Sequence, residues 1–199
     1  MQLDFKQDLV LENNRVRLTP LSVNHINDLS HVVINNPDIL KYSPPKFGTV
    51  DLLKVYVNTN VTLRENSQKY PFAIFDKIKE MYAGSTSYMN ISQKDLRLEI
   101  GSTWIGKSFQ RSGLNRNCKF LLMQYAFEVL RIERLEFKTD KRNIQSQTAI
   151  EAIGGRYEGL LRSHTVMSDG FRRDTVCYSI LNNEWPAIKK SVFSQIGSK

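Results

Sequence analysis

Residues that commonly ligate metals or form disulfide bridges are scarce in this sequence. Its 199 residues include 2 cysteines and 3 histidines, and their separations match no metal-ligand spacing. Cys118 and Cys177 both lie in apolar periodic segments, which favours small core residues in a reducing cytosol over a disulfide. We therefore expect a cytoplasmic protein without a bound metal.

Long apolar runs and repetitive segments are also absent. No run approaches the roughly 20 apolar residues that span a bilayer, so no membrane partner is expected. The N-terminal stretch MQLDFKQDLV carries acids and lacks the apolar centre of a secretory signal. No repeat and no linker rich in Gly, Ser or Pro divides the chain. We expect one domain over residues 1–199, with its core at about 12–185 and a short C-terminal tail over 186–199.

A familiar phosphate-binding motif is missing, because no GxGxxG follows a strand, which excludes the dinucleotide-binding fingerprint. The net charge is nevertheless +8, with 28 Lys and Arg against 20 Asp and Glu. This balance favours anionic partners, which include nucleic acid, acidic protein surfaces and phosphorylated cofactors.

The sequence does contain a regular succession of elements. A short strand within 15–22 precedes a helix that Ser22 or Asn24 caps and that runs to about Ile34; a loop over 41–51 and a helix over 51–66 follow. Further strands are expected at 70–76, 81–91, 95–106 and 134–140, helices near 116–130 and 143–155, and an antiparallel pair over 156–181. The strand–helix–strand unit over 95–140 should form a right-handed parallel crossover. The order predicts an α+β, or mixed α/β, fold with one mixed sheet.

Two of the helices have apolar residues at helical spacing. In the first of them, over 51–66, Leu52, Val55, Tyr56 and Leu63 are expected near one face. In the helix that starts near 116 the spacing is clearer, and it predicts a buried stripe made of Cys118, Leu121, Leu122, Tyr125, Ala126 and Val129.

The loop between the 95–106 strand and this helix is suited to hold an anion. A helix N-terminus offers unpaired N–H groups and about half a positive charge. Gly113 would allow a ligand to approach the backbone closely, and Asn115 can cap the helix or adopt a left-handed turn. Arg111 and Arg116 bracket the loop with positive charge. An ordinary surface loop before a capped helix is the competing interpretation.

The segment QRSGLN, residues 110–115, resembles the acetyl-CoA loop of GNAT-family N-acetyltransferases. That family's pattern is Gln/Arg-x-x-Gly-x-Gly/Ala, and Asn115 replaces the final small residue. The stretches FKTDKRNIQSQTAIEAIGGRYEG and DGFRRDTVCYSI are similar to the branch that contains ribosomal-protein N-acetyltransferases. The resemblance covers about residues 15–181.

The resemblance implies a central, mostly antiparallel mixed sheet that splays between two parallel strands, is flanked by helices and holds acetyl-CoA in the gap. The backbone of Thr103, Trp104 and Ile105 would bind the pantetheine, although the Trp104 side chain is expected to be a half-buried strand aromatic. Asn143 would contact the pantetheine or the thioester end, cap its helix, or do both. The pyrophosphate would lie on the loop made of Gln110, Arg111, Ser112, Gly113, Leu114, Asn115 and Arg116.

Acetyl transfer to an amine requires a base, because an alkyl ammonium with a pKa near 10 must first lose a proton. Glu99 occupies a position where the family often places a carboxylate base, and it points either into the cleft or into solvent. His164 has a suitable pKa range, or it is a solvated strand histidine.

An acid for the leaving thiolate is harder to assign. Many relatives place a tyrosine seven residues after the position of Asn143, but here that residue is Ile150. Ser146, which matches the Asn-x-x-Ser pattern of the ribosomal-protein branch, could hydrogen-bond the sulfur or only cap its helix. Tyr178 is a second candidate.

The sequence thus predicts an acyltransferase that moves an acetyl group from acetyl-CoA to a primary amine, on a protein N-terminus (ribosomal or other) or on a small molecule. A basic rim made of Lys41, Lys46, Arg172 and Arg173 would discourage a polyamine and tolerate an acidic protein or an anionic small amine. A non-catalytic ribosome- or RNA-associated module with the same fold is the alternative, supported by the net charge of +8 and by Ile150. Relatives often pair, so a homodimer is also considered.

Overall fold

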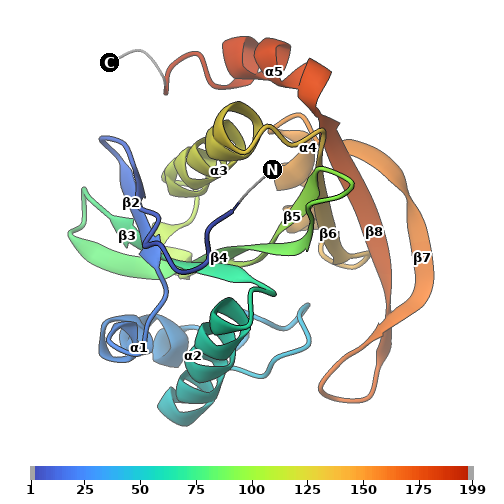
Figure 1. Cartoon of the computed structure of the whole chain (residues 1–199). Coiled ribbons are helices and arrows are strands. Elements are labelled where there is room, and N and C mark those ends of the chain that lie inside the picture. Colours follow the sequence, from blue (N-terminus) through green and yellow to red (C-terminus); the bar gives the residue numbers. More distant parts are fainter. Residues whose placement is uncertain (1–2, 197–199) are drawn as a thin grey trace.

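The fold is built on one eight-stranded mixed sheet with helices on both faces (Figure 1). The computed structural model describes residues 3–196. The strands follow in the spatial order β1-β2-β3-β4-β5-β6-β8-β7. Their bounds are β1 Leu11–Glu12, β2 Val16–Pro20, β3 Tyr70–Asp76, β4 Met81–Ser92, β5 Arg97–Ile105, β6 Arg134–Asp140, β7 Arg156–Val166 and β8 Arg172–Leu181.

Among the strands of residues 3–196, the only parallel pair is also the most open one. β5 and β6 are parallel, and their register contains three pairs, Arg97–Arg134, Leu98–Leu135 and Glu99–Glu136. Beyond Glu99 and Glu136 the two strands are no longer paired, although β5 continues to Ile105 and β6 to Asp140. All other neighbouring strands are antiparallel. The predicted mixed, splayed sheet is therefore confirmed.

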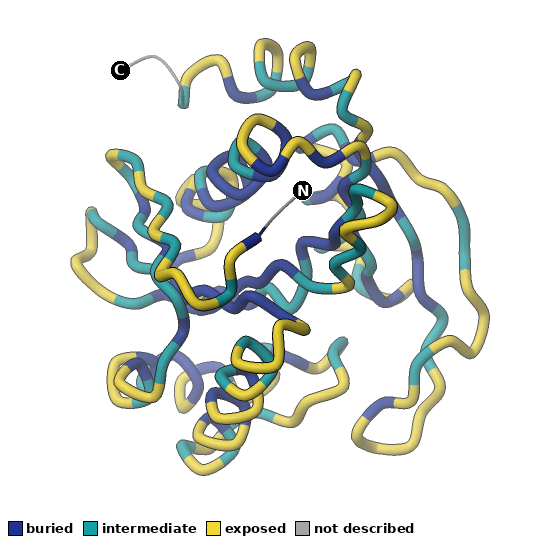
Figure 2. Tube along the Cα trace, in the orientation of Figure 1, coloured by how far each residue is buried: buried dark blue, intermediate teal, exposed yellow. Residues whose placement is uncertain are grey.

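Two layers of helices enclose the central strands. Helices α1 (His25–Asn35) and α2 (Val50–Glu65) lie below the sheet in Figure 1, and α3 (Leu114–Gln124) and α4 (Ile144–Glu151) lie above it. Strands β3 to β5 are mostly buried, whereas the edge strand β7 is largely exposed (Figure 2). No helix among residues 3–196 is both long enough and apolar enough to cross a bilayer.

The predicted buried stripe of the α3 segment is confirmed along most of its length and wrong at its end. Cys118, Leu122 and Ala126 are fully buried, but Val129 is 61% exposed. The reason is that residues Tyr125–Val129 form a π-helical turn after α3. A π turn takes more residues than an α turn, so it rotates the following side chains away from the core.

In α2 the predicted face is displaced by one residue. The buried residues are Leu53, Tyr56, Val57 and Asn60, while Val55 is 63% exposed. Tyr56 packs against Trp104 of β5 with ring centroids 5.9 Å apart. This contact sets the rotation of the helix. The periodicity alone could not, because apolar residues such as Leu52, Leu53 and Val55 point to more than one side of α2.

The C-terminal segment is more ordered than the expected tail. Residues Trp185–Val192 form α5, which lies over α3 (Figure 1). Trp185 stacks on Phe127 at 5.5 Å, and Phe193 lies 5.4 Å from Phe120. The boundary expected near residue 185 is therefore corrected, because these aromatic rings belong to the core. Residues 1–2 and 197–199 of the expected domain lie outside the described range.

Candidate active site

The gap between β5 and β6 is bordered on one side by strand backbone that β4 leaves unpaired. In an antiparallel strand, the N–H and C=O groups of successive residues face opposite neighbours. Trp104 is paired with Ser85, and its carbonyl oxygen lies where a β-carbon on Gly84 would be, so its backbone faces β4. The backbone groups of Thr103 and Ile105 consequently face the gap. The Trp104 side chain is 2% exposed, which makes it a core residue and corrects the half-buried expectation.

The loop after β5 reverses direction through two residues in the left-handed conformation. Arg111 has φ 55° and Gly113 has φ 80°, and α3 begins at the next residue, Leu114. Gly113 occupies the N-cap position, so the expectation that Asn115 caps the helix is wrong. Asn115 is the second residue of the helix, and its buried Oδ1 atom has no hydrogen-bond partner within residues 3–196.

The main-chain donors of this loop are unused. Within residues 3–196, none of the amides of residues 111–116 donates a hydrogen bond to another group. Several N–H groups that converge at a helix N-terminus form a site for an anion, because they combine directed donors with partial positive charge. The backbone of this loop therefore has the properties that the sequence predicted for an anion cradle.

An ion pair beneath the loop holds it in place, and no sequence pattern indicates it. The guanidinium of Arg15 pairs with Asp76 and also donates to Ser112 Oγ at 3.1 Å. Ser112 Oγ in turn donates to the Phe109 carbonyl at 2.6 Å. Burial alone would raise the pKa of Asp76, but Arg15 and the amides of residues 78 and 79 lower it below its ordinary range.

The two arginines that bracket the loop differ in their placement. Arg111 is exposed at the turn. Arg116 donates to the main-chain carbonyl of Val192 at the end of α5, and its guanidinium lies 5.9 Å from the Phe193 ring centroid. The Arg116 side chain thus ties α3 to the C-terminal segment, and only its amide faces the loop.

The start of α4 lies next to the same loop. Asn143 caps α4, because its Oδ1 accepts from the Ser146 N–H at 3.1 Å. The Ser146 hydroxyl has no hydrogen-bond partner within residues 3–196. Gln145 Nε2 donates to Gln110 Oε1 at 3.2 Å, and Gln110 Nε2 donates to the Ile105 carbonyl at 2.9 Å. Side chains of α4 and the loop are therefore connected to the main chain of β5.

Glu99 lies where the two strands separate. It is only 4% exposed, so it is not the solvated strand residue that was one of the two options. Its Oε2 accepts from Asn90 Nδ2 at 2.8 Å and from Lys138 Nζ at 2.9 Å, whereas Oε1 accepts no hydrogen bond from residues 3–196. A β-carbon on Gly101 would come within 3.0 Å of that Oε1. Glycine at 101 therefore keeps the free oxygen open.

The cation beside Glu99 is itself held by a second acid. Lys138 Nζ also donates to Glu136 at 3.1 Å. Burial alone would lower the pKa of Lys138, but its hydrogen bonds to Glu99 and Glu136 raise it above the ordinary value. Lys138 is consequently a permanent cation that orients Glu99 and leaves one carboxylate oxygen for a substrate.

The remaining candidates are not brought to the gap. His164 is exposed on the edge strand β7, where its Nδ1 lies 3.1 Å from Thr175 Oγ1, and β8 separates it from β6. The buried Tyr178 hydroxyl donates to Glu151 Oε1 at 3.1 Å. Burial first and the Glu151 carboxylate second raise the pKa of Tyr178 to about 12. Ile150 is the buried residue of α4 within the described range.

Two buried lysines next to the gap were missed by sequence reasoning. Lys69 Nζ donates to Ser102 Oγ at 2.9 Å, and Lys119 Nζ donates to Thr103 Oγ1 at 2.8 Å. Burial lowers the pKa of Lys69 to about 8, an effect that Glu99 partly opposes. Both lysines contact the bulged part of β5, where Ser102 has φ 49°.

The loop 36–49 and the β7–β8 hairpin meet on the α2 side of the sheet, as expected for a substrate rim. Arg173 donates to the Tyr42 carbonyl at 2.7 Å. Lys41 and Lys46 line a cavity of about 210 Å³ between this loop and the hairpin tip. Arg172 instead turns toward Ser163 of β7, with Nε 2.8 Å from its hydroxyl.

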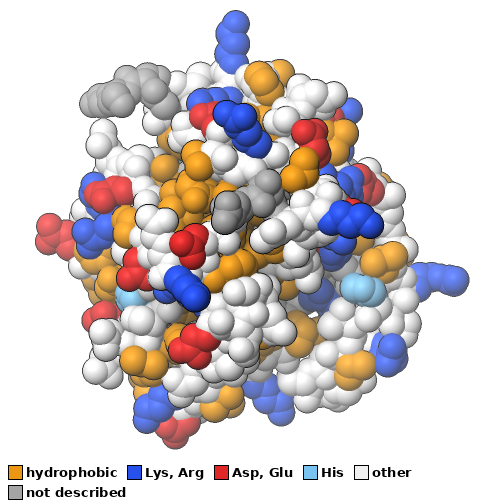
Figure 3. All heavy atoms as spheres, in the orientation of Figure 1, with side chains coloured by type: hydrophobic (Ala, Val, Ile, Leu, Met, Phe, Trp, Pro, Cys, Tyr) orange, Lys and Arg blue, Asp and Glu red, His pale blue; other side chains and the backbone are white. Residues whose placement is uncertain are grey.

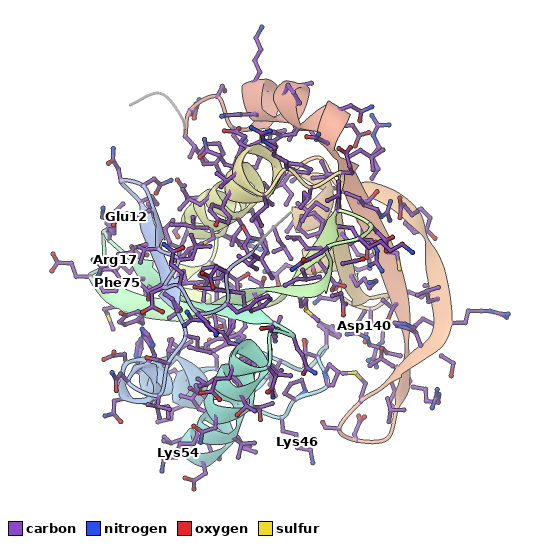
Figure 4. The ribbon with its side chains drawn as sticks, viewed as in Figure 1. Glu12, Arg17, Lys46, Lys54, Phe75 and Asp140 are labelled. Carbon is purple, nitrogen blue, oxygen red and sulfur yellow. The ribbon has the colours of Figure 1, made fainter. Side chains whose placement is uncertain are left out.

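Charged side chains mark this side of the molecule in the figures. Asp140 at the end of β6 and Lys46 lie between α2 and the β7–β8 hairpin (Figure 4). Lys and Arg side chains stand out along the side where β7 and β8 lie (Figure 3).

Within residues 3–196, no three His, Cys, Asp or Glu side chains are grouped as metal ligands.

Comparison with known proteins connects this arrangement to one family. The model of the acetyltransferase (GNAT) domain matches residues 15–156. YdaF of Bacillus subtilis (strain 168), a candidate ribosomal N-acetyltransferase, is 34% identical over 106 residues, which are 53% of this chain and 57% of that protein. The chain thus spans little more than half the length of this relative.

Solved structures share the fold over nearly the whole chain. A GCN5-related N-acetyltransferase from Brucella melitensis has a TM-score of 0.86 and 29% identity, covering 96% of this chain and 87% of that one. A candidate acetyltransferase from T. thermophilus has a TM-score of 0.84 and 33% identity, covering 94% and 96%. The chain therefore belongs to the GNAT family of acetyltransferases, in agreement with the resemblance of its loop 110–115.

Proposed function

We propose that this protein transfers the acetyl group of acetyl-CoA directly to a primary amine. The observation that carries the proposal is the row of unused amides over residues 111–116, at a helix N-terminus beside an open parallel strand pair. In this proposal those amides bind the pyrophosphate, and Gly113 lets it approach the backbone. Acetyl-CoA supplies an activated thioester.

The gap between β5 and β6 is the proposed place for the pantetheine arm. The backbone groups of Thr103 and Ile105 face it and would bind the arm as a neighbouring strand would. Asn143 and Ser146 at the start of α4 would lie near its thioester end. The Ile105 carbonyl would have to exchange its hydrogen bond from Gln110 for one from the arm.

Glu99 is the proposed general base. An alkyl ammonium has a pKa near 10 and is not nucleophilic, so it must lose a proton before it attacks a thioester. Glu99 Oε1 has no hydrogen bond from residues 3–196 and would receive this proton directly or through one water molecule. Lys138 fixes the other oxygen and so fixes the direction in which Oε1 points.

We propose a protein N-terminus as the acceptor, with a ribosomal protein as one case. The relative YdaF carries the name of a ribosomal N-acetyltransferase, and the rim with Lys41, Lys46 and Arg173 favours an acceptor that has negative charge near its amine. A cytoplasmic location is part of the proposal, in keeping with the free thiols of both cysteines. A homodimer also remains a proposal.

The test combines binding with turnover. Acetyl-CoA should raise the melting temperature, and thiol release should be faster with acidic N-terminal peptides than with spermidine. Glu99→Gln should lower kcat by about 10²–10⁴-fold at little cost in acetyl-CoA affinity, because general bases contribute on this scale. Glu65→Gln, on the exposed end of α2, is the matched control and should change neither quantity.

The outcomes separate this proposal from the alternative of a non-catalytic ribosome- or RNA-associated module. Retention on RNA together with no thermal response to acetyl-CoA would contradict the enzyme. Faster turnover of spermidine than of any peptide would contradict the acceptor while leaving the donor in place.

A further inference from the structure

Lys119 extends from the second turn of α3 into the gap between β5 and β6. It is only 7% exposed. Its Nζ donates to Thr103 Oγ1 of β5 at 2.8 Å and lies 5.9 Å from the ring centroid of Phe137 on β6. Both residues come after the last paired residues of their strands, so the ammonium lies where the strands have separated, on the α3 side of the sheet.

This ammonium lacks the partners that a buried cation requires. A lysine has three N–H donors, and Thr103 Oγ1 is the one hydrogen-bond acceptor that residues 3–196 provide. That oxygen is also shared with Thr86 Oγ1 at 2.8 Å. No Asp or Glu within residues 3–196 forms an ion pair with Lys119, and the other groups that face it are Phe137 and Cys118.

The absence of a counter-ion among residues 3–196 goes with a lowered pKa of Lys119. Burial lowers the pKa of Lys119 to about 8, and the effect of Cys118 in the other direction is smaller. An uncompensated buried cation destabilises a fold, so it is normally replaced by an apolar residue unless it has a use. An anion that arises in the gap during catalysis would supply such a use.

We propose that Lys119 binds and protonates the sulfur of coenzyme A as the acetyl group leaves it. The inference rests on the proposed function, because it places the thioester in the gap. The amine nitrogen forms a bond to the acetyl carbon, the carbon–sulfur bond breaks, and its electron pair goes to sulfur. Lys119 hydrogen-bonds the resulting thiolate and gives it a proton, which yields the free thiol and a neutral amine that takes a proton back from solvent.

This role divides the two proton transfers between the two faces of the sheet. Glu99 lies where β5 and β6 separate, and its partners Asn90 and Lys138 come from β4 and β6. It would accept the proton of the acceptor amine. Lys119 comes from α3, and its lowered pKa lies close to that of a thiol, which suits proton transfer between them. Lys119 would therefore fill the role for which Ile150 leaves no tyrosine.

The test measures the ionisation of bound coenzyme A and needs no turnover. The ultraviolet absorbance of the thiolate is titrated with pH for free coenzyme A and for its complexes with the parent protein and Lys119→Met. We expect binding to the parent to lower the pKa of the thiol by at least one pH unit, because a cation at hydrogen-bond distance favours the anion. In the complex with Lys119→Met the pKa should lie at or above that of free coenzyme A.

A second measurement distinguishes a sulfur contact from a contact elsewhere on the pantetheine. Desulfo-coenzyme A, which lacks the sulfur, should bind the parent and Lys119→Met with affinities within about twofold. An equal loss of affinity for both ligands, with an unchanged thiol pKa in the parent, would overturn the inference while leaving the proposed function intact. A parent protein that binds neither ligand would overturn the proposed function itself.

Discussion

Lys119→Met should make the ligand-free protein more stable. Burial lowers the pKa of Lys119 from its ordinary 10.5 to about 8. At about 1.4 kcal/mol per pH unit, this difference opposes folding by roughly 3 kcal/mol at neutral pH. Replacing Lys119 by Met removes this penalty but also removes the hydrogen bond to Thr103, which stabilises the parent by about 1 kcal/mol. We expect the free energy of unfolding to rise by about 2 kcal/mol, and the melting temperature by roughly 4–8 °C.

The pH dependence of this gain has a defined sign. Below pH 8 the lysine is protonated in both the folded and the unfolded parent, so the advantage of the variant is complete and constant. Between pH 8 and 10.5 the folded parent releases its proton first, and its stability rises relative to the variant. The advantage should therefore shrink as the pH rises through this range and should be gone by about 10.5.

Urea unfolding at a series of pH values measures the effect. Lys190→Met is the matched control, because Lys190 is exposed on α5 and has no ion pair within residues 3–196; it should change stability by less than about 0.5 kcal/mol. A Lys119→Met variant that is less stable than its parent at pH 7 would refute the reasoning, since it would mean that the ammonium is adequately compensated. We expect Lys119→Met to be more stable and less active than the parent, as is common when a residue that serves function at a cost in stability is replaced.

Three other substitutions test the surroundings of the site. Gly113→Ala places a side chain at φ 80°, and the resulting strain of about 1 kcal/mol should weaken acetyl-CoA binding roughly five- to tenfold by calorimetry; unchanged affinity would contradict the role of the loop conformation. Asp76→Asn leaves the guanidinium of Arg15 without its counter-ion and should cost about 3 kcal/mol in urea unfolding, whereas a loss below 1 kcal/mol would count against the ion pair as a support of the loop. The hydrogen bond from Arg134 lowers the pKa of Glu158 from 4.5 to about 2, so the stability that Glu158 contributes is fully present above pH 4.5 and is lost as the pH falls toward 2. Because this pair is solvent-screened, Glu158→Gln should cost less than about 1 kcal/mol at pH 7, and a cost that persists at pH 2 would rule out the linkage.

Elements with a strong local pattern could be predicted from the sequence. The hairpin of β3 and β4 follows from two strand-like runs separated by a charged turn, and Asn143 begins α4 as a side-chain cap should. The anion loop was also predictable, because a glycine before a helix is a local feature. In the structure, the left-handed conformations of Arg111 and Gly113 give the loop its turn.

Features that depend on distant contacts could not be predicted. The π turn that exposes Val129 and the aromatic contacts of α5 arise from packing between elements far apart in the chain. Lys119 illustrates the same limit at the site. A lysine in an amphipathic helix predicts a solvated face, but α3 lies between the sheet and α5 and is therefore buried nearly all round. The neighbours of Glu99 that decide its orientation come from β4 and β6.

The central claim is that the main-chain amides of residues 111–116 bind the pyrophosphate of acetyl-CoA. Amide NMR of the isotope-labelled protein during a titration with coenzyme A tests it most directly, because a hydrogen bond to a phosphate oxygen moves the resonance of the donating N–H downfield. The account predicts that the amides of Ser112, Gly113, Leu114 and Asn115 show the largest downfield shifts, and that pantetheine, which lacks the pyrophosphate, leaves them in place. Saturating coenzyme A that shifts other amides and leaves these four unchanged would contradict it.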